Sequence, residues 1–298
     1  MNMPHVDNAI ILAAGTSSRF APLSREHHKA MTVVRGEILI ERQIRQLKDA
    51  GIADIIIVTG YKAEEFSYLV EDFGVRIIHN PFYMERNNNS SIWMARDYIS
   101  NSYICSSDNW FNINPFETEV PSGYYAAEFA EGDTNEWCLS VDSKDIITGV
   151  SVGGHCQWYM MGHVFWDQNF SSRFLKILSK EYDRPETAAK LWESIYADHL
   201  DELELKIRRY EPGDIFEFDS LDELRLFDNS YYADSHSRIL KEVAKRLSAR
   251  ETDFREFRPL KGKGTEAVGF SFIYNGIEYN YNYDEGKLIH GRNTCKGN

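Results

Sequence analysis

The chain has 298 residues, 43 % of them hydrophobic, which is enough to bury a large core in one domain or in one domain with an appendage. Its formal net charge of −13 argues against general binding to nucleic acid or to an anionic membrane, because both need a basic surface. No apolar stretch reaches the roughly 18 to 20 residues of a membrane span, and residues 1–8 do not resemble a signal peptide. We therefore expect a cytoplasmic protein with no nucleic-acid partner and no direct membrane insertion, in which any anionic ligand is held locally.

The cysteines point to no covalent or metal framework. They lie far apart in the sequence and form no CxxC pair, so the pattern indicates neither a disulfide framework nor a zinc site. The four residues are Cys105, Cys138, Cys156 and Cys295.

The first third of the chain alternates between buried strands and amphipathic helices. Residues 8–12 and 54–58 are continuous apolar runs, and residues 37–50 have a helical periodicity that ends at Gly51. The alternation continues with helix, strand, helix and strand at 63–74, 75–80, 90–99 and 102–107. This pattern is typical of an α/β fold with a doubly wound, mostly parallel, Rossmann-like sheet. Ligands of such sheets bind beyond the carboxyl ends of the strands, so the loops after residues 12, 58, 78 and 106 are where chemistry is expected.

The pattern changes after residue 111. Short extended runs indicate a small antiparallel lid, and they lie at 123–129, 136–141, 147–152 and 158–166. Helical patterns return at 170–180 and 186–203. After a further helix at about 235–248, the dipeptide Asn275-Gly276 between alternating residues predicts a β-hairpin. We therefore expect a large domain at 1–232 and an appendage, a helix with a β-hairpin, at 233–298.

The loop after the first strand is the strongest local feature. Gly15, preceded by Ala13 and Ala14, would let the backbone approach a ligand closely and would offer amide groups to phosphate oxygens. Arg19 and Lys29 add the positive charge that suits a triphosphate. The spacing fits neither the Walker pattern nor GxGxxG, and a simple tight turn explains the small residues equally well.

Two aspartates lie where a metal ion could bind. Magnesium prefers oxygen ligands and usually takes one or two carboxylates together with substrate phosphates. Asp108 follows the strand at 102–107, at the expected carboxyl edge of the sheet. Asp219 lies in the segment "FEFDS", in which Glu217 would point to the same face. Taken alone, an aspartate after a strand is more often a turn residue.

Residues 9–31, "AIILAAGTSSRFAPLSREHHKAM", resemble the signature LAAGxGxR-x-x-PL-x(4–6)-K of sugar-phosphate and alcohol-phosphate nucleotidylyltransferases. Within this superfamily the chain is most similar to the bacterial CTP:phosphocholine cytidylyltransferases. Further matching segments, among them "RNNNSSIWMARDYI", "DTNEWCLSV" and "GDIFEFDSLDEL", extend the resemblance to about residue 230. Two residues depart from the signature: Ser17 replaces its second glycine, and His28 replaces the proline that usually precedes the lysine.

The resemblance implies transfer of the cytidylyl group of CTP to phosphocholine, with release of pyrophosphate and with Mg²⁺ as the cofactor. Arg19, Lys29 and Asp108 are then the catalytic residues, and Asp108 and Asp219 are the metal ligands. The residues that the match assigns to nucleotide binding are Leu12, Ala13, Ala14, Gly15, Asn88 and Ser91. For any one residue of "NNNSS", a role as helix N-cap is at least as good an explanation.

The acceptor pocket can be predicted from the chemistry of choline. A quaternary ammonium group donates no ordinary hydrogen bonds, so proteins bind it with aromatic faces and nearby carboxylates. Trp137 matches the cage tryptophan of the family, Glu131 lies six residues before it, and Trp192 falls close to another cage position. Most of the aromatic residues, 13 % of the chain, must belong to the core. We expect core positions for Trp158, Tyr159 and Trp166.

Residues 233–298 resemble the start of the choline-kinase-type domain that follows this transferase in some fused bacterial proteins. The segment contains no catalytic loop, so we expect no kinase activity from it. A packing or dimerisation appendage is the expected role. Removal of residues 236–298 should then spare catalysis, because every matched motif lies upstream.

Two other functions stay open. One is a nucleotidylyltransferase acting on 2-aminoethylphosphonate, phosphoethanolamine or a sugar 1-phosphate, and Trp137 argues only weakly for choline against these. The other is a nucleotide-binding regulatory protein without turnover, suggested by Ser17 and the kinase-like segment. The presence of Arg19, Lys29 and both aspartates speaks against it. The expected partners are CTP and phosphocholine, with a homodimer as a further expectation.

Overall fold

The computed structural model describes residues 3–262 and 264–293, and for 291–293 it describes the backbone alone. Contacts between residues group the chain into two compact units. Unit 1 comprises Met1–Gly15 and Leu39–Glu217, and unit 2 comprises Thr16–Ile38 and Phe218–Asn298. The segment that carries Arg19 and Lys29 thus folds with the C-terminal part of the chain. The predicted domain boundary at 232/233 stays a prediction.

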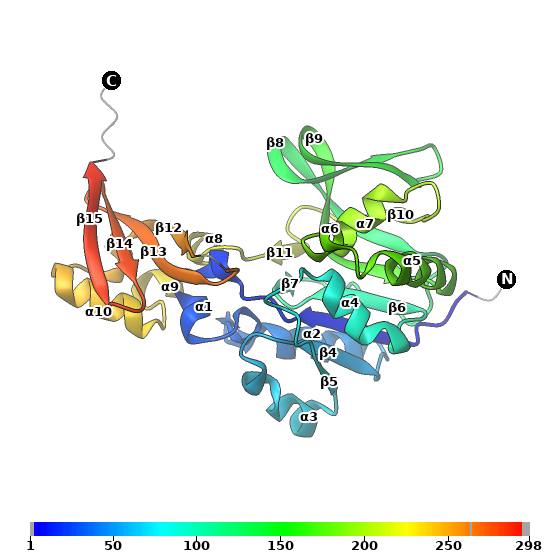
Figure 1. Cartoon of the computed structure of the whole chain (residues 1–298), viewed down its shortest axis with the longest axis horizontal. Coiled ribbons are helices and arrows are strands. Elements are labelled where there is room, and N and C mark those ends of the chain that lie inside the picture. Colours follow the sequence, from blue (N-terminus) through cyan, green and yellow to red (C-terminus); the bar gives the residue numbers. More distant parts are fainter. Residues whose placement is uncertain (1–2, 263, 294–298) are drawn as a thin grey trace. The chain divides into compact units, whose positions relative to one another are not determined.

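Unit 1 is built on a seven-stranded sheet with the order β10-β8-β9-β6-β1-β4-β5 (Figure 1). Its strands are β1 (Asn8–Ala13), β4 (Ile55–Thr59), β5 (Arg76–His79), β6 (Ser102–Ser106), β8 (Tyr124–Val141), β9 (Ile147–Trp166) and β10 (Lys206–Arg209). Strand β1 pairs in parallel with β4 and β6, and β4 pairs in parallel with β5. Strand β9 is antiparallel to both of its neighbours. The predicted mostly parallel, Rossmann-like α/β sheet is therefore confirmed.

The core of unit 1 explains why these strands are continuous apolar runs. Ile10 lies between Ile56 and Ile104 in the sheet, and all three side chains are buried. Burial on both faces of the sheet removes the need for a polar face. The helices of this unit are α2 (Leu39–Asp49), α3 (Tyr68–Phe73), α4 (Asn89–Ala95), α5 (Gln168–Glu181), α6 (Pro185–Ala188) and α7 (Trp192–Asp198), and the 3-10 turns are η3 (Ala63–Phe66) and η4 (Arg96–Tyr98).

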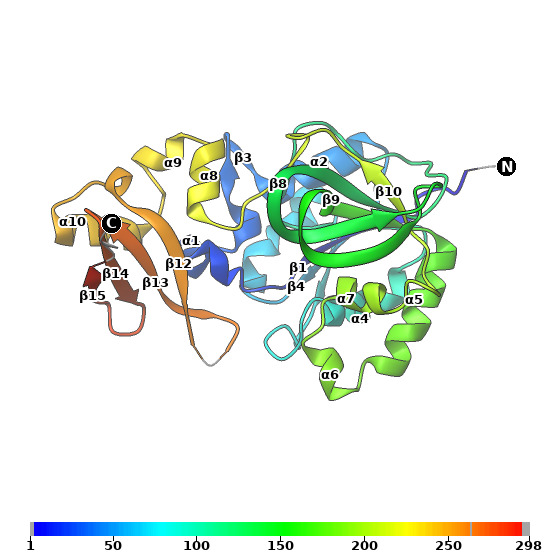
Figure 2. The same cartoon turned by 90° about the horizontal axis from the view of Figure 1, so that it is seen from above.

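The predicted lid consists of two long strands rather than four short ones. Strands β8 and β9 form an antiparallel hairpin that continues far beyond the other strands of the sheet (Figures 1 and 2). Register shifts between Ala130 and Val141 bend the pair, because each bulge adds a residue to one strand and increases the local twist. The sequence shows these bulges as breaks in the alternation. A two-stranded ladder, β7 (Asn109–Phe111) with β11 (Ile215–Glu217), lies after β6.

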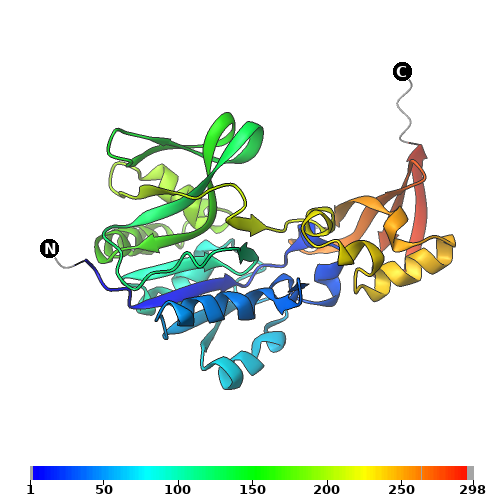
Figure 3. The same cartoon turned by 180° about the vertical axis from the view of Figure 1, so that it is seen from behind.

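Unit 2 joins an early segment with the C-terminal region. Its early elements are η1 (Ser18–Phe20), α1 (Leu23–Glu26), η2 (Lys29–Met31), β2 (Val33–Val34) and β3 (Glu37–Ile38). Its later elements are α8 (Leu221–Phe227), α9 (Ser230–Ala233), α10 (Arg238–Leu247), η5 (Glu251–Asp253), β12 (Arg255–Lys261), β13 (Ala267–Tyr274), β14 (Ile277–Asn282) and β15 (Lys287–Asn293). The last four strands form one antiparallel sheet, which Figure 3 shows in orange and red.

The C-terminal hairpin is confirmed at its turn, although it belongs to a larger sheet. Asn275 and Gly276 have φ values of 50° and 75°, as a two-residue type I′ turn requires. Strands β12 and β15 add one partner on each side of the β13–β14 hairpin. We predicted a single hairpin for the appendage, whereas the structure has an antiparallel sheet of four strands. Strand β12 was hard to recognise because its ladder has two register shifts.

The remaining sequence expectations concern cysteines and membrane spans. In the described part of the chain, Cys105, Cys138 and Cys156 are free, and Cys295 lies outside the described residues. None of the described helices combines the length and the apolar character that a membrane crossing needs.

Candidate active site

The loop after β1 has room for a ligand. Ala13 and Ala14 are buried, and the Ala14 carbonyl accepts a hydrogen bond from the Tyr61 backbone at 3.1 Å, which fixes the loop against the end of β4. Apart from Gly15 and its two chain neighbours, no described atom lies within 4 Å of the position that a Cβ on Gly15 would take. Leu12, which is half-buried, is the last but one residue of β1 and so lies just before the loop. The chain therefore presents a fixed backbone edge with open space beside it, which suits close approach of a phosphate or a nucleoside.

Ser17, in unit 2, has the backbone conformation of a glycine. Its φ and ψ are 48° and 42°, in the left-handed region that glycine adopts without cost and that costs a serine roughly 1 to 2 kcal/mol. This is the position at which the signature has its second glycine. The departure from the signature therefore changes the residue and its strain, while the chain still follows the left-handed path.

Arg19, Lys29 and Asp219 form one charged cluster within unit 2. An Arg19 guanidinium nitrogen lies 2.5 Å from one oxygen of Asp219, and the Lys29 ammonium lies 3.2 Å from the other. The Lys29 side chain is only 3 % exposed, whereas that of Arg19 is 69 % exposed. Lys29 is thus a buried cation and Arg19 an exposed one, and both are of the kind that binds phosphate oxygens.

His28 supports the turn that holds Lys29. Its Nδ1 accepts a hydrogen bond from the Ala30 backbone at 3.1 Å and so caps η2. Its φ of −63° is close to the value that a proline ring imposes, which explains why histidine can stand where the signature has proline.

Asp108 and Glu217 come together in unit 1. Asp108 lies in the turn between β6 and β7, as predicted, and β7 pairs with β11 so that Asn109 is opposite Glu217. Carboxylate oxygens of Asp108 and Glu217 lie within 4.8 Å of each other, and the Asn109 amide donates to Glu217 at 3.4 Å. Two carboxylates at this spacing are within reach of one hard cation, so the donor set fits magnesium. Asp219, the other predicted metal ligand, follows Glu217 by two residues in the chain.

Asn88 joins the start of α4 to the start of α7. Its side-chain oxygen accepts a hydrogen bond from the Trp192 backbone at 2.7 Å, and its amide nitrogen donates to the Glu193 carboxylate at 3.0 Å. Ser91 lies inside α4, where its hydroxyl accepts a hydrogen bond from Asn80 at 3.1 Å. Of the N-cap alternatives for "NNNSS", Ser90 and Ser91 are wrong because they lie inside the helix, whereas Asn88 holds the N-cap position but makes no side-chain cap bond. The predicted roles of Asn88 and Ser91 in nucleotide binding stay predictions.

Two carboxylates, the buried Glu128 and the half-buried Glu193, were not singled out from the sequence. Burial raises the pKa of Glu193 to about 7, although the hydrogen bond from Asn88 opposes the shift. Burial likewise raises the pKa of Glu128 to about 6. Glu128 accepts the Ile215 backbone N–H at 3.0 Å, and the Tyr125 hydroxyl lies 3.5 Å from Glu193. Carboxylates with raised pKa values beside aromatic rings are candidates for a functional site. The sequence signal for Glu193 was its place directly after Trp192, and Glu128 had no comparable signal.

The predicted acceptor residues lie in different surroundings. Trp137 is half-buried on β8 and packs against the edge of the core, and Glu131 is exposed on the same strand. Trp192 is only 2 % exposed, stacks on Tyr125 with ring centres 5.7 Å apart, and meets Trp166 edge-on at 5.1 Å. The structure thus gives Trp192 a packing role, and its predicted contact with substrate stays a prediction.

The three residues that we expected in the core, Trp158, Tyr159 and Trp166, differ in burial. Trp166 is fully buried, as predicted. Trp158 and Tyr159 are half-buried on β9; Trp158 packs edge-on against Phe129, and the Tyr159 hydroxyl lies 3.5 Å from Glu128. The lid therefore carries aromatic and acidic side chains together.

Comparison with known proteins agrees with this arrangement. The MobA-like NTP transferase domain family matches residues 9–106. The choline-phosphate cytidylyltransferase of Streptococcus pneumoniae is 33 % identical over 73 % of this chain and 95 % of its own length. The 2-aminoethylphosphonate cytidylyltransferase of Lancefieldella rimae is 32 % identical over 75 % of this chain and 93 % of its own length.

A solved structure gives the same answer for the fold. The CTP:phosphocholine cytidylyltransferase structure from Streptococcus pneumoniae matches with a TM-score of 0.73 and 32 % identity, covering 76 % of this chain and 99 % of that one. The similarity thus extends over almost the whole of these relatives, and with the loop after β1 and the carboxylates after β6 it leads to one conclusion. The chain belongs to the cytidylyltransferase family of nucleotidyltransferases that includes the bacterial choline-phosphate cytidylyltransferases.

Proposed function

We propose that the chain transfers the cytidylyl group of CTP to phosphocholine, giving CDP-choline and pyrophosphate. The observation that carries the proposal is the 33 % identity to the Streptococcus pneumoniae choline-phosphate cytidylyltransferase over 95 % of that enzyme. The structure adds the loop of Gly15 and the cations Arg19 and Lys29, which are the kinds of groups that this reaction needs.

The reaction is an attack by a phosphate oxygen of the acceptor on the α-phosphorus of CTP, in line with the bond to the leaving pyrophosphate. A new phosphoanhydride bond forms as the α–β bond breaks, and the electron pair leaves with pyrophosphate. The protein mainly has to hold the two anions together and offset the charge on the phosphates. Lys29, buried and fixed by the turn that His28 caps, would hold phosphate oxygens in place. Arg19, exposed, would move from Asp219 onto the triphosphate.

Magnesium is the proposed cofactor, held by Asp108 and Asp219. When bound, such an ion neutralises phosphate charge and polarises the phosphoryl oxygens. Asp219 would give up its pairing with Arg19 and Lys29 as these cations turn to the phosphates. Glu217, within 4.8 Å of Asp108, is a third carboxylate of the right kind.

The metal assignment predicts the behaviour of Asp108→Asn. This change keeps the size of the side chain but removes its charge, so turnover should fall by about a hundredfold or more while the free energy of unfolding hardly changes. Turnover at saturating and limiting Mg²⁺ and chemical denaturation measure the two effects. Asp97→Asn, which removes the charge of an exposed carboxylate on η4, is the matched control and should keep wild-type turnover. Near-normal turnover of Asp108→Asn would refute the assignment.

Trp137 is the residue on which the choice of phosphocholine depends. We propose that its ring lies against the trimethylammonium group, with Glu131 and Trp192 as further acceptor contacts. A cation–π contact in a desolvated pocket is worth roughly 1 to 2 kcal/mol, so Trp137→Ala should weaken the apparent affinity for phosphocholine by roughly 5- to 30-fold. The affinity for CTP should stay nearly the same.

The measurement is the ratio of kcat/KM for phosphocholine and phosphoethanolamine in both proteins. Phosphoethanolamine carries a smaller and more strongly hydrated ammonium, so it should lose less, and the ratio should narrow. Trp158→Ala, on the partner strand, is the matched control for loss of an aromatic side chain from the lid. An unchanged ratio, or an equal loss in CTP affinity, would show that Trp137 has a packing role.

A second acceptor is favoured by specific observations. Glu128 is buried and Glu193 is half-buried, and a primary ammonium donates hydrogen bonds to carboxylates, which a trimethylammonium cannot do. The 2-aminoethylphosphonate cytidylyltransferase relative is almost as similar to this chain. The alternative function is therefore cytidylyl transfer to 2-aminoethylphosphonate.

A screen of pyrophosphate release decides between these functions. It combines each of the four nucleoside triphosphates with phosphocholine, phosphoethanolamine, 2-aminoethylphosphonate and glucose 1-phosphate. Highest kcat/KM for CTP with phosphocholine is the expected result. Preference for 2-aminoethylphosphonate would replace the acceptor, and no release in any combination, despite binding of CTP, would favour the regulatory alternative.

Further parts of the proposal concern the whole protein. We propose that residues 233–298 derive from the start of a choline-kinase-type domain, supported by their sequence and by the helix α10 that precedes an antiparallel sheet. We also propose that the enzyme works in the cytoplasm as a homodimer. Light scattering of the purified protein and cell fractionation test the last two statements.

A further inference from the structure

Two glutamines of α2 are buried on a helix whose other buried side chains are apolar. Gln43 is 1 % exposed and Gln46 is 9 % exposed, and their spacing of three residues places them on the same side of the helix. The remaining buried residues of α2 are Leu39, Ile40, Ile44 and Leu47. Burial of a primary amide costs free energy unless the amide forms hydrogen bonds. The position of these two amides therefore indicates a specific hydrogen-bonding role.

Gln43 binds the backbone just before the two-residue turn that carries Asp108 (the Asp108 turn). Its amide nitrogen donates to the Ser106 carbonyl at 3.0 Å. Ser106 is the last residue of β6, and Asp108 follows it by two residues. The ladder between β6 and β9 ends one residue earlier, at Cys105. Gln43 thus restrains the strand at the point where it leaves that ladder and enters the turn.

The backbone just after the same turn is also bound to α2. The Gln46 amide and the Arg42 guanidinium both donate to the Phe111 carbonyl, each at 3.0 Å. Phe111 is the last residue of β7. Since the backbone of a helix is held by its own hydrogen bonds, α2 offers a fixed frame. The chain on both sides of the Asp108 turn is therefore tied to one helix.

The β7–β11 ladder extends this frame to Glu217. Asn109 is opposite Glu217 in the ladder, and its amide donates to the Glu217 carboxylate at 3.4 Å. Carboxylate oxygens of Asp108 and Glu217 lie within 4.8 Å of each other. The spacing of these two carboxylates therefore depends on where α2 holds β7.

We propose that Gln43 and Gln46 are positioning residues that set the spacing of Asp108 and Glu217 for a divalent cation. Loss of a group that orients metal ligands commonly weakens metal binding about 10- to 100-fold. Each glutamine acts through the backbone of the Asp108 turn. The expected effect on turnover rests on the proposed function, whereas metal binding is measured without turnover.

Metal binding is tested on the full chain with Mn²⁺ as the probe and without nucleotide, and free Mn²⁺ is measured by electron paramagnetic resonance. Gln43→Met keeps the length of the side chain and removes the amide donor, so it should weaken Mn²⁺ binding about tenfold. Gln46→Met should weaken it less, because Arg42 still donates to the Phe111 carbonyl. Gln46→Met also carries the test if denaturation curves show that Gln43→Met is unfolded. Wild-type affinity in the folded variants, or no Mn²⁺ binding by the wild type, would overturn the proposal.

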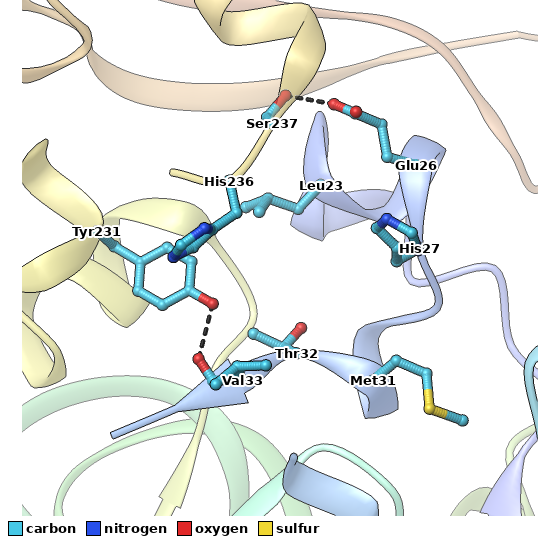
Figure 4. A pocket seen from close by; sticks show the side chains of 9 residues that line it. All are labelled: Leu23, Glu26, His27, Met31, Thr32, Val33, Tyr231, His236 and Ser237. Carbon is cyan, nitrogen blue, oxygen red and sulfur yellow. Dashed lines mark hydrogen bonds between the residues drawn. The ribbon is translucent and has the colours of Figure 1, made fainter. Parts of the chain in front are cut away.

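Two control variants remove similar hydrogen bonds elsewhere. Asn8→Leu removes the bond from the Asn8 amide to the Tyr98 carbonyl, at 2.7 Å, which lies at the amino end of β1. Tyr231→Phe removes the bond from the Tyr231 hydroxyl to the Val33 carbonyl, at 2.7 Å, in the wall of a cavity in unit 2 (Figure 4). Both controls should lose stability and keep the wild-type affinity for Mn²⁺. An equal loss of affinity in the controls would show a general effect of lost hydrogen bonds and would contradict the proposal.

Turnover separates positioning from general damage. In Gln43→Met, the Mg²⁺ concentration for half-maximal turnover should rise about tenfold, while kcat at saturating Mg²⁺ and the KM for CTP stay near the wild-type values. A lower kcat with an unchanged Mg²⁺ requirement would show loss of folded enzyme and would count against a positioning role. If no acceptor supports turnover by the wild type, the proposed function fails, and Mn²⁺ binding still decides the role of the two glutamines.

Discussion

Ser17 shows how one residue can depart from a signature and still keep its geometry. The left-handed conformation at this position is imposed by the path from the loop of Gly15 to η1, which Ser17 caps at its N-terminus. Serine carries a Cβ into a region where it crowds the following carbonyl. The cost falls on stability, and the backbone path that the nucleotide would meet is preserved.

Ser17→Gly should therefore stabilise the protein. Removal of the Cβ relieves roughly 1 to 2 kcal/mol of strain in the folded state. Glycine also has greater conformational freedom in the unfolded chain, which offsets about half of this gain. The free energy of unfolding should therefore rise by about 0.5 to 1 kcal/mol. Urea denaturation measures the change. Ser17→Ala, which keeps the Cβ and loses the hydroxyl, is the matched control. A gain in stability with alanine as well would show that the hydroxyl, and not the backbone strain, is unfavourable.

Strand β9 contains a histidine that ties the protein's stability to pH. His163 is 1 % exposed and its Nε2 lies 3.1 Å from the Tyr124 hydroxyl and 3.4 Å from that of Tyr210. Burial, helped by the positive charge of Arg208, lowers the pKa of His163 to about 3. The imidazole is therefore neutral in the folded protein at any pH near neutrality.

The sign of the pH effect follows from this lowered pKa. The unfolded chain binds a proton on His163 below about pH 6.5, whereas the folded chain does so only near pH 3, so this histidine lowers the free energy of unfolding as the pH falls between these values. Between pH 6.5 and 5, the titration of His163 lowers the free energy of unfolding by about 2 kcal/mol. Glu193 has the opposite effect on stability. Its raised pKa makes the folded state bind a proton more readily than the unfolded state below about pH 7, so Glu193 raises the free energy of unfolding as the pH falls.

His163→Gln isolates the contribution of the histidine. Glutamine offers a hydrogen-bond acceptor to Tyr124 but does not titrate, so the stability of the variant should fall less steeply between pH 6.5 and 5, by about 2 kcal/mol over that interval. Denaturation curves at several pH values for both proteins give the difference. Parallel profiles for wild type and His163→Gln would contradict the assignment.

At the scale of the whole molecule, unit 2 links the signature to the C-terminal region. The Glu26 carboxylate, in the signature segment, caps α10, and the Thr16 hydroxyl donates to the Thr265 carbonyl at 3.2 Å. Arg225 connects the later elements, since its buried guanidinium donates to the carbonyls of Tyr231, Glu251 and Phe254. Residues 236–298 are therefore part of the unit that holds Arg19 and Lys29.

This arrangement reverses the sequence-based expectation for a truncated chain. Removal of residues 236–298 should lower turnover at least about tenfold, because it leaves Glu26 without its donors and removes most of the unit that contains Lys29. Full-length Glu26→Gln, which removes the charge and keeps the chain, should lower turnover in the same direction and to a smaller extent. Pyrophosphate release and circular dichroism of both proteins are the measurements. Wild-type turnover in a folded truncated chain would restore the view of a dispensable appendage.

The sequence by itself determined the local elements and the chemistry of the loop. Continuous apolar runs at β1, β4 and β6, and Asn275-Gly276 at a tight turn, have a direct physical meaning, because burial on two faces and positive φ restrict which residues are allowed. The signature placed Gly15 at the end of the first strand, and the structure has it there with open space beside it. These features depend on neighbours in the sequence.

The tertiary structure alone decided which distant residues meet. The Asn88 side chain accepts a hydrogen bond from the Trp192 backbone N–H, at the start of α7. The predicted helix at 186–203 is therefore two helices, α6 and α7, and Trp192 packs in the core against Tyr125 and Trp166. The segment of Arg19 and Lys29 folds with the C-terminal region rather than with the strand that precedes it. Such contacts join positions from 26 to more than a hundred residues apart, and they depend on side-chain shape and on hydrogen-bond partners that periodicity does not record.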